Sequence, residues 1–327
     1  MPAHDAVMPA TPPPSSPRER QTRGYLLATL AAAGWAAGGV TAKWLFDVSS
    51  LPVEPVHLAA ARALLAFVML LGYLGAARRD ALRVSARDLP FLGVFGVLGL
   101  AAMHFTYFAA IEATSVPTAI LLEYLAPVLV LVVSVAVLGE RFTWALPAGV
   151  ALSVTGCALV VGAIGGDGLT VTPAGIGWGL ASAVFFAGYT LMGKHAAGTY
   201  SPWTLLVYGL GAATVFWFLY LGIRGDLRPV LALLSSPVPA FAVVAMAFGA
   251  TVIPFGAFLK ALSYVDATKA SITATLEPVM AAAATYMIPA LYRPLSPLQV
   301  LGGLLVLAAC VVVQAPDRSR TALPPPT

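Results

Sequence analysis

Ten runs of apolar residues, separated by short polar segments, follow one another along this chain of 327 residues. A bilayer core about 30 Å thick is crossed by about 20 apolar residues in a helix, which satisfies its own backbone hydrogen bonds. The pattern therefore predicts an all-α integral membrane protein with ten transmembrane helices. The predicted spans are residues 24–45, 55–76, 89–111, 116–138, 144–163, 174–194, 201–222, 239–261, 267–289 and 296–314.

The pattern of residues occurs twice, at a constant separation of 151 positions. Pro127 matches Pro278 in this way, and Trp35 matches Phe186. Such self-similarity indicates an internal repeat. Because each copy holds five spans, an odd number, the second copy must enter the membrane from the opposite side. The chain is thus predicted to consist of two inverted five-helix repeats, an architecture that secondary transporters build around a site near the bilayer midplane.

The repeats are predicted to occupy residues 23–163 and 172–314. Residues 1–22 are rich in proline and serine, a composition that cannot build a packed core. We expect residues 1–22 and 315–327 to be disordered tails.

Orientation follows from lysine and arginine, which concentrate in cytoplasmic loops. If the N-terminus is cytoplasmic, the outer loops hold only Arg224, Arg228 and Arg293. This distribution predicts a multi-pass protein of the cell membrane with both termini in the cytoplasm.

The amino-acid composition limits which binding partners we expect for this protein. Hydrophobic residues make up 59% of the chain and charged residues 10%, against roughly 25% charged in soluble proteins. The net charge of +4 forms no basic cluster with interleaved aromatics, so we expect membrane lipid and a small-molecule substrate as partners, and no nucleic acid. No phosphate loop, zinc-ligand spacing or Ser/His/Asp arrangement is present, so we expect no enzyme, cofactor or metal site. The oligomeric state stays open.

Ionisable residues inside spans are costly and mark candidate functional sites. At a rise of ~1.5 Å per residue, Arg62, Glu123 and His104 fall at a similar depth, about 10 Å below the outer surface. These three groups could form an outer gate or a substrate anchor. A fixed structural pair between Arg62 and Glu123 is the alternative, and the sequence leaves both open.

Glu277 is predicted near the midplane, directly before Pro278, whose ring removes a backbone hydrogen bond and frees a carbonyl one turn earlier. A carboxylate there could bind a substrate ammonium, or a proton as coupling ion; a silent hydrogen-bonded acid is the alternative. The aromatic candidates for the cavity, each of which could also be ordinary packing, are Trp35, Tyr107, Tyr124, Phe186, Tyr189 and Phe255. Lys194 and Lys260, near span ends, are predicted to extend toward the lipid headgroups.

Three short motifs accompany the duplication: Ala61-Arg62, the pattern from Pro127 to Leu138-Gly139-Glu140-Arg141, and Glu277-Pro278. With ten spans, they resemble the EamA-type carriers of the drug/metabolite transporter superfamily. The resemblance implies transport of amino acids or other small metabolites, often outward, with the fifth and tenth helices peripheral to a central cavity.

We therefore expect a secondary transporter that exports a small metabolite by alternating access, with an amino acid as the first candidate. An importer or exchanger of another class, such as nucleotide sugars, is one alternative. A non-transporting membrane sensor or assembly protein is another.

Overall fold

The computed structural model describes residues 16–48, 54–114, 116–163, 172–287 and 295–314. Within these ranges the chain is helical, and β pairing is limited to one isolated bridge between Ala197 and Tyr200. Eight helical stretches are long and apolar enough to cross a membrane. This is the fold of an all-helical, multi-pass membrane protein.

The first half contains α1 (Pro17–Val48), α2 (Pro55–Ala77), η1 (Arg79–Leu82), α3 (Leu89–Val94), η2 (Phe95–Ala102), α4 (Met103–Ala113), α5 (Val116–Glu123), α6 (Ala126–Ala136) and α7 (Ala145–Val160). The second half contains α8 (Pro173–Ala196), α9 (Pro202–Arg224), α10 (Arg228–Ser235), α11 (Pro237–Ala247), η3 (Phe248–Val252), α12 (Ile253–Ala261), α13 (Ala267–Ala274), α14 (Leu276–Met287) and α15 (Pro297–Gln314). The segments η2 and η3 are π-helical turns inside two continuous rods, α3–η2–α4 and α11–η3–α12.

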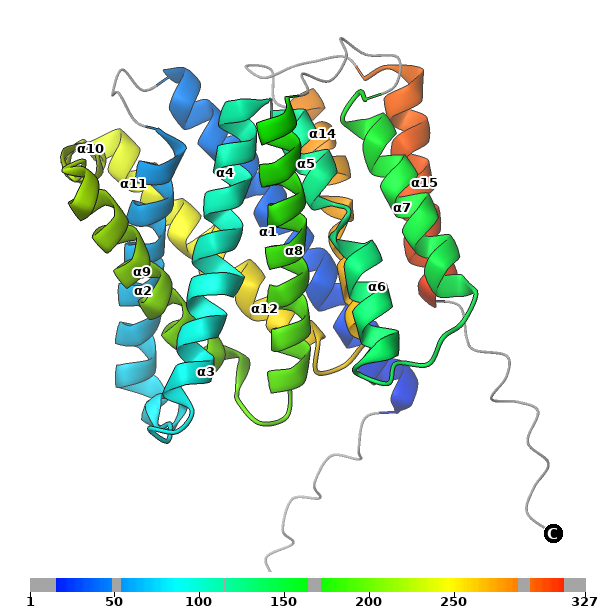
Figure 1. Ribbon diagram of the computed structural model, residues 1–327, viewed down its shortest axis with the longest axis horizontal. Helices are drawn as coiled ribbons and strands as arrows, with labels where there is room; N and C mark the ends of the chain where they lie inside the picture. Colours follow the sequence, from blue (N-terminus) through cyan, green and yellow to red (C-terminus); the bar gives the residue numbers. More distant parts are fainter. Residues whose placement is uncertain (1–15, 49–53, 115, 164–171, 288–294, 315–327) are drawn as a thin grey trace, which may run out of the picture.

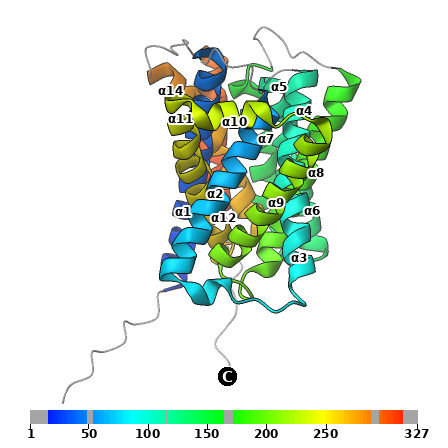
Figure 2. The same ribbon diagram turned by 90° about the vertical axis from the view of Figure 1, so that its left-hand side faces the viewer.

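The long helices run between two faces of the molecule (Figure 1). α1 begins at the lower face of that view, whereas α8 begins at the upper face, and α15 ends at the lower face again. The short helix α10 lies at the upper face in both views (Figure 2). The first helices of the two halves therefore start from opposite faces.

Irregularities in the helices recur at the separation found in the sequence. α5 begins at Val116 and ends at Glu123, and α13 begins and ends 151 positions later, at Ala267 and Ala274. The π-helical turn η3 likewise lies 151 positions after residues 97–101, inside η2. The same helices are thus interrupted at the same places in both halves.

The π-helical turn η3 has a local cause in the sequence. Pro254 has no N–H to offer the carbonyl of Ala250, and its ring would clash there in a regular helix. The wider turn relieves this clash, and the Thr251 hydroxyl donates to the carbonyl of Met246 at 3.1 Å. Turns of this kind concentrate at functional sites.

The last helices of the two halves, α7 and α15, lie against each other at the right-hand side of Figure 1. A Cβ placed on Gly156 would lie 2.7 Å from the carbonyl oxygen of Gly302, and one placed on Gly302 would lie 2.6 Å from that of Gly156. Only glycine at both positions permits this approach of two backbones.

The first helix corrects one expectation. Residues 17–22 continue α1, where the sequence was expected to give a disordered tail. Ser16 and Glu19 explain the helical start, because the Ser16 hydroxyl accepts from the Glu19 N–H at 3.2 Å and the Glu19 carboxylate accepts from the Ser16 N–H at 2.9 Å. Such a reciprocal pair satisfies backbone donors at a helix start. Residues 1–15 and the predicted tail at 315–327 lie outside the described residues.

Candidate functional site

The interruption between α13 and α14 places a carboxylate beside a carbonyl that has lost its helical donor. Pro278 cannot donate to the carbonyl of Ala274. The Tyr124 hydroxyl, from the matching interruption between α5 and α6, lies 3.3 Å from that oxygen and donates to Oε2 of Glu277 at 2.6 Å. Tyr124 therefore connects the break between α5 and α6 in the first half with the break between α13 and α14 in the second half.

Arg62 on α2 interacts with this acid rather than with Glu123. Its electrostatic partners are Glu277 and the Tyr107 hydroxyl. Arg62 and Glu123 are both described, and no direct ion pair joins them or joins Arg62 to Glu277. The fixed structural pair between Arg62 and Glu123, one of the two alternatives that the sequence left open, is thus not formed, and the guanidinium interacts with Glu277 of α14 instead.

Glu123 lies in the same cluster but has different neighbours. It interacts electrostatically with Glu277, and Tyr107 interacts with both acids. The fully buried Ser182 Oγ of α8 faces the Glu123 carboxyl and makes no well-formed hydrogen bond with any described group. Two acids, one guanidinium and two phenols therefore share one enclosed region.

A small cavity adjoins Arg62 and His104. His104 Nδ1 donates to the carbonyl of Leu100 at 2.6 Å, which fixes the imidazole proton on that nitrogen. The cavity has a volume of about 20 Å³, room for about one water molecule. It is far too small for a metabolite, so this conformation is closed around the charged cluster.

The cavity lies where the two halves meet. Residues 151 positions apart line it in pairs: Ala59 with Leu210, Arg62 with Ala213, Leu100 with Thr251, and His104 with Phe255. The guanidinium and the imidazole each belong to one half only. The same holds for the two acids. The position equivalent to Glu123 in the second half is Ala274, and the position equivalent to Glu277 in the first half is Ala126.

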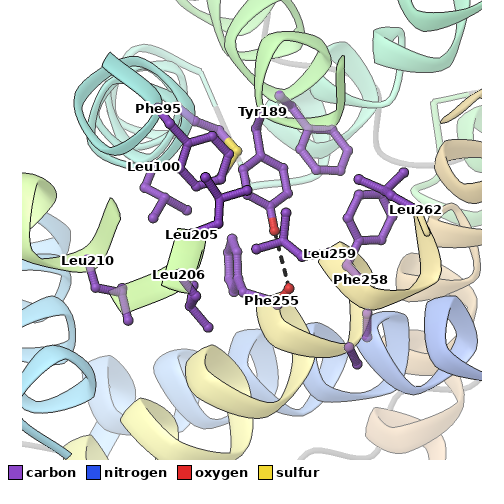
Figure 3. Close-up of a cluster of buried hydrophobic side chains, with 14 of the residues drawn as sticks. Phe95, Leu100, Tyr189, Leu205, Leu206, Leu210, Phe255, Phe258, Leu259 and Leu262 are labelled. Carbon is purple, nitrogen blue, oxygen red and sulfur yellow. Dashed lines mark hydrogen bonds between the residues drawn. The ribbon is translucent and has the colours of Figure 1, made fainter. Parts of the chain in front are cut away.

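An aromatic cluster forms a wall next to these groups. The Trp35 ring centroid lies 5.2 Å from that of Phe255 and 6.1 Å from that of Phe186. Tyr189 stacks on Phe258 at 5.9 Å and its hydroxyl donates to the Phe255 carbonyl at 3.4 Å, as Figure 3 shows. The buried Nε1–H of Trp35 has no partner among the described residues.

The structure brings the predicted candidates into two adjoining groups. The charged group holds Arg62, His104, Tyr107, Glu123, Tyr124 and Glu277. The aromatic group holds Trp35, Phe186, Tyr189 and Phe255, and His104 joins the groups through its contact with Phe255 at 5.8 Å. Sequence reasoning missed Ser182, because no pattern in the chain marks a single buried serine.

A model of the EamA-like transporter family matches the chain twice, over residues 22–162 and 173–314. The chain belongs to this family. The resemblance inferred from the short motifs is thereby confirmed, and the family indicates transport rather than catalysis.

Relatives of this EamA-like protein carry transporter names. An uncharacterized transporter of Archaeoglobus fulgidus is 32% identical over 228 residues, which cover 66% of this chain and 75% of the relative. A probable terminal-alkyne amino-acid exporter of Streptantibioticus cattleyicolor is 28% identical over 240 residues, 71% of this chain and 75% of the relative. A crystal structure with 22% identity superposes with a TM-score of 0.74, covers 89% of this chain and 96% of that chain, and shows the same fold.

This EamA-like transporter also has a clamp at its lower face that the sequence analysis did not predict. After Gly139, whose φ of +67° favours glycine, Glu140 turns toward the start of α13. Its Oε1 accepts from the Ala267 N–H at 2.6 Å and its Oε2 from the Thr268 hydroxyl at 2.9 Å. An anion at a helix N-terminus is favourable, so the Leu-Gly-Glu turn caps a helix of the other half.

Lys194 holds the same turn from α8. Its Nζ donates to the carbonyls of Leu262 and Val265 at 3.0 and 2.7 Å. The expectation that Lys194 extends toward lipid is therefore wrong, because the free carbonyls at the end of α12 bind its ammonium. Lys260 is exposed and lies 5.3 Å from the ring centroid of Tyr264.

Glu54, His57 and Asp226 at the upper face have the residue types of a metal site. His57 Nδ1 accepts from the Glu54 N–H at 3.0 Å, so the proton of a neutral imidazole sits on Nε2, 2.9 Å from the Asp226 carboxylate. A metal on Nε2 would need that proton on Nδ1. The three residues therefore fit a hydrogen-bonded link between α2 and the end of α9 better than a metal centre.

Proposed function

We propose that this membrane transporter exports amino acids across the cell membrane by alternating access. The observation that carries the proposal is the arrangement of Arg62 and Glu277, which face each other in an enclosed region without forming an ion pair. A guanidinium binds carboxylates in a bidentate manner, and a carboxylate accepts from an ammonium. Opposite charges that interact without pairing directly suit the two ends of a zwitterion.

The aromatic cluster complements these charges. Trp35, Phe186 and Phe255 give the region an apolar wall beside the polar groups, as in most small-molecule sites. The unpartnered N–H of Trp35 costs free energy while it stays buried and unpaired. A bound substrate that offers an acceptor to it would recover that cost.

We further propose that ten spans form two inverted repeats with both termini in the cytoplasm. The matched interruptions at α5 and α13, the matched π-helical turns, and the start of α1 and α8 at opposite faces support this architecture. The lower face in Figure 1 would then be cytoplasmic, because it carries most of the loop arginines.

Amino acids are favoured over other metabolites by the charge pattern and by one relative. The probable exporter from Streptantibioticus cattleyicolor handles an amino acid according to its name. Its 28% identity supports the substrate class and the outward direction, but it does not identify which amino acid this protein exports.

The test is release of metabolites from liposomes that contain the purified protein and are preloaded with the twenty amino acids and a set of nucleotide sugars. We expect amino acids to appear outside faster than from protein-free liposomes. Arg62→Gln and Glu277→Gln should each lower this rate at least tenfold, because each removes one charged end of the site. Arg228→Gln, at an exposed position at the start of α10, is the matched control.

Export in living cells completes the test. Cells that express the protein should accumulate the same amino acids in the medium faster than cells without it. Release of nucleotide sugars alone, or equal release with and without the protein, would contradict the proposal.

A further inference from the structure

The charged cluster holds one more acid than a zwitterion needs. Among the described residues, the interacting groups with a formal charge are Arg62, Glu123 and Glu277. His104 lies beside Arg62, and its Nδ1 donates to the carbonyl of Leu100. If Arg62 binds a substrate carboxylate and Glu277 the α-ammonium, the carboxylate of Glu123 is left without a counter-charge.

The two acids also differ in their surroundings. Glu277 accepts a hydrogen bond from Tyr124 at 2.6 Å and faces Arg62. Glu123 has no described cation beside it; its neighbours are the Ser182 hydroxyl, the Tyr107 phenol and the like charge of Glu277. A buried carboxylate without a partner is strongly unfavourable, so a positive group is missing at this position.

Glu123 sits at the end of α5, where further acceptors gather. Pro127 has no N–H to donate to the main-chain carbonyl of Glu123, so that oxygen loses its usual helical donor. Ser182 Oγ, which is fully buried and faces the Glu123 carboxyl, is unpartnered. The carboxylate, the carbonyl and the hydroxyl offer three acceptors, and an alkylammonium has three N–H donors.

α5 packs against α4, α7 and α8, and the groups that these helices turn toward Glu123 carry no positive charge. α4 contributes the phenol of Tyr107, α8 the hydroxyl of Ser182, and α7 the thiol of Cys157 near Tyr124. No described side chain therefore supplies the missing positive charge, which leaves a cationic group of the substrate or a proton as its source.

We propose that Glu123 and Ser182 bind a second positive charge on the substrate, and that the transporter prefers amino acids with a cationic side chain, such as lysine and ornithine. This inference rests on the proposed function, because it assigns the α-carboxylate to Arg62 and the α-ammonium to Glu277. The aromatic wall next to the cluster suits the aliphatic part of such a side chain and its charged end.

The experiment compares substrates in the same liposomes. Initial rates of exchange are measured for lysine, ornithine, leucine, phenylalanine and glutamate at equal concentrations, with proton movement followed by an internal pH dye. A charge-assisted contact in a buried site changes affinity by tenfold or more. We therefore expect lysine and ornithine to be exchanged at least about tenfold faster than leucine, and glutamate not to be exchanged.

Two variants test the assignment to this acid. Glu123→Gln should lower lysine exchange about tenfold and bring the lysine-to-leucine ratio close to one. Ser182→Ala should reduce the same ratio by a smaller factor. Glu112→Gln, which alters an exposed acid on α4, is the matched control and should keep the wild-type ratio. Leucine exchange by Glu123→Gln shows that the variant folds and inserts.

Two results would overturn the inference. Equal rates for lysine and leucine in the wild-type protein would remove the preference. Leucine exchange accompanied by proton uptake that disappears in Glu123→Gln would make a proton, not a substrate cation, the partner of Glu123. If no amino acid is exchanged at all, the proposed function itself is rejected. Failure of the proposed function can therefore be told apart from failure of the preference for cationic side chains.

Discussion

The hydroxyl of Tyr124 donates to the Glu277 carboxylate at 2.6 Å across the junction between the two halves of the chain. The same hydroxyl lies 3.3 Å from the Ala274 carbonyl that Pro278 leaves without a helical donor. One side chain thus stabilises the break in the partner helix and orients the acid beside it.

Tyr124→Phe removes this donor and keeps the ring. We expect the free energy of unfolding to fall by about 1–3 kcal/mol, because the buried carboxyl group of Glu277 loses its hydrogen bond. Transport should also slow, since Glu277 is no longer held in place. Thermal unfolding in detergent and exchange in liposomes measure the two effects. Tyr73→Phe, on a side chain that is 59% exposed, should change neither, and equal behaviour of both variants would contradict the role of Tyr124.

The clamp at the lower face predicts a change in accessibility. Glu140→Ala removes the cap of α13, which is worth about 0.5–2 kcal/mol, and Lys194→Met removes the ammonium from the end of α12. We expect either variant to open this face more often. A cysteine at Ser263, in a background without the native cysteines, should then react faster with a water-soluble maleimide. Arg141→Ala, next to the clamp and exposed, is the control, and an unchanged labelling rate in both clamp variants would reject the idea.

The proposed topology predicts which side of the membrane each loop faces. Single cysteines at Asp80 and Thr199 should react with an impermeant reagent only from the cytoplasm, and a cysteine at Asp167 only from outside. Labelling of the Thr199 and Asp167 variants from the same side would show that the second half is not inverted.

The contact between α7 and α15 predicts a steric effect. Gly156→Leu would place a side chain where the backbone of Gly302 lies, and overpacking of this kind costs about 1–3 kcal/mol or more. We expect a lower unfolding temperature and less folded protein in the membrane. Gly177→Leu, on α8 with open space around it, should leave both unchanged. A Gly156→Leu protein as stable as this control would show that the helices separate at little cost.

The sequence predicted an all-helical membrane protein and the loss of a helical hydrogen bond at Pro278, because apolar length and proline act locally. It also placed Arg62, Glu123 and Glu277 in the membrane. It did not predict that Arg62 faces Glu277, since that depends on how α2 and α14 are rotated about their axes. Nor did it assign a partner to Glu140, whose contact with Ala267 spans 127 positions and depends on the packing of the halves.

Some features were readable but were not used. The pair of Ser16 and Glu19 has the spacing of a helix start, and Pro254 gives a reason for the turn η3. The turn η2 contains no proline, so only its alignment with η3 by the 151-residue separation could have indicated it.

Every charged member of the cluster exists in one half only, and this has a consequence for the chain as a gene product. A homodimer of the first half would hold two copies of Arg62 and Glu123 and no Glu277, and a homodimer of the second half would hold no guanidinium in the cavity. Neither half can complete the site by pairing with itself. If the coding sequence were cut between the halves, we expect activity only when both fragments are co-expressed. Each half therefore depends on the other, and a single polypeptide supplies the two in equal amounts.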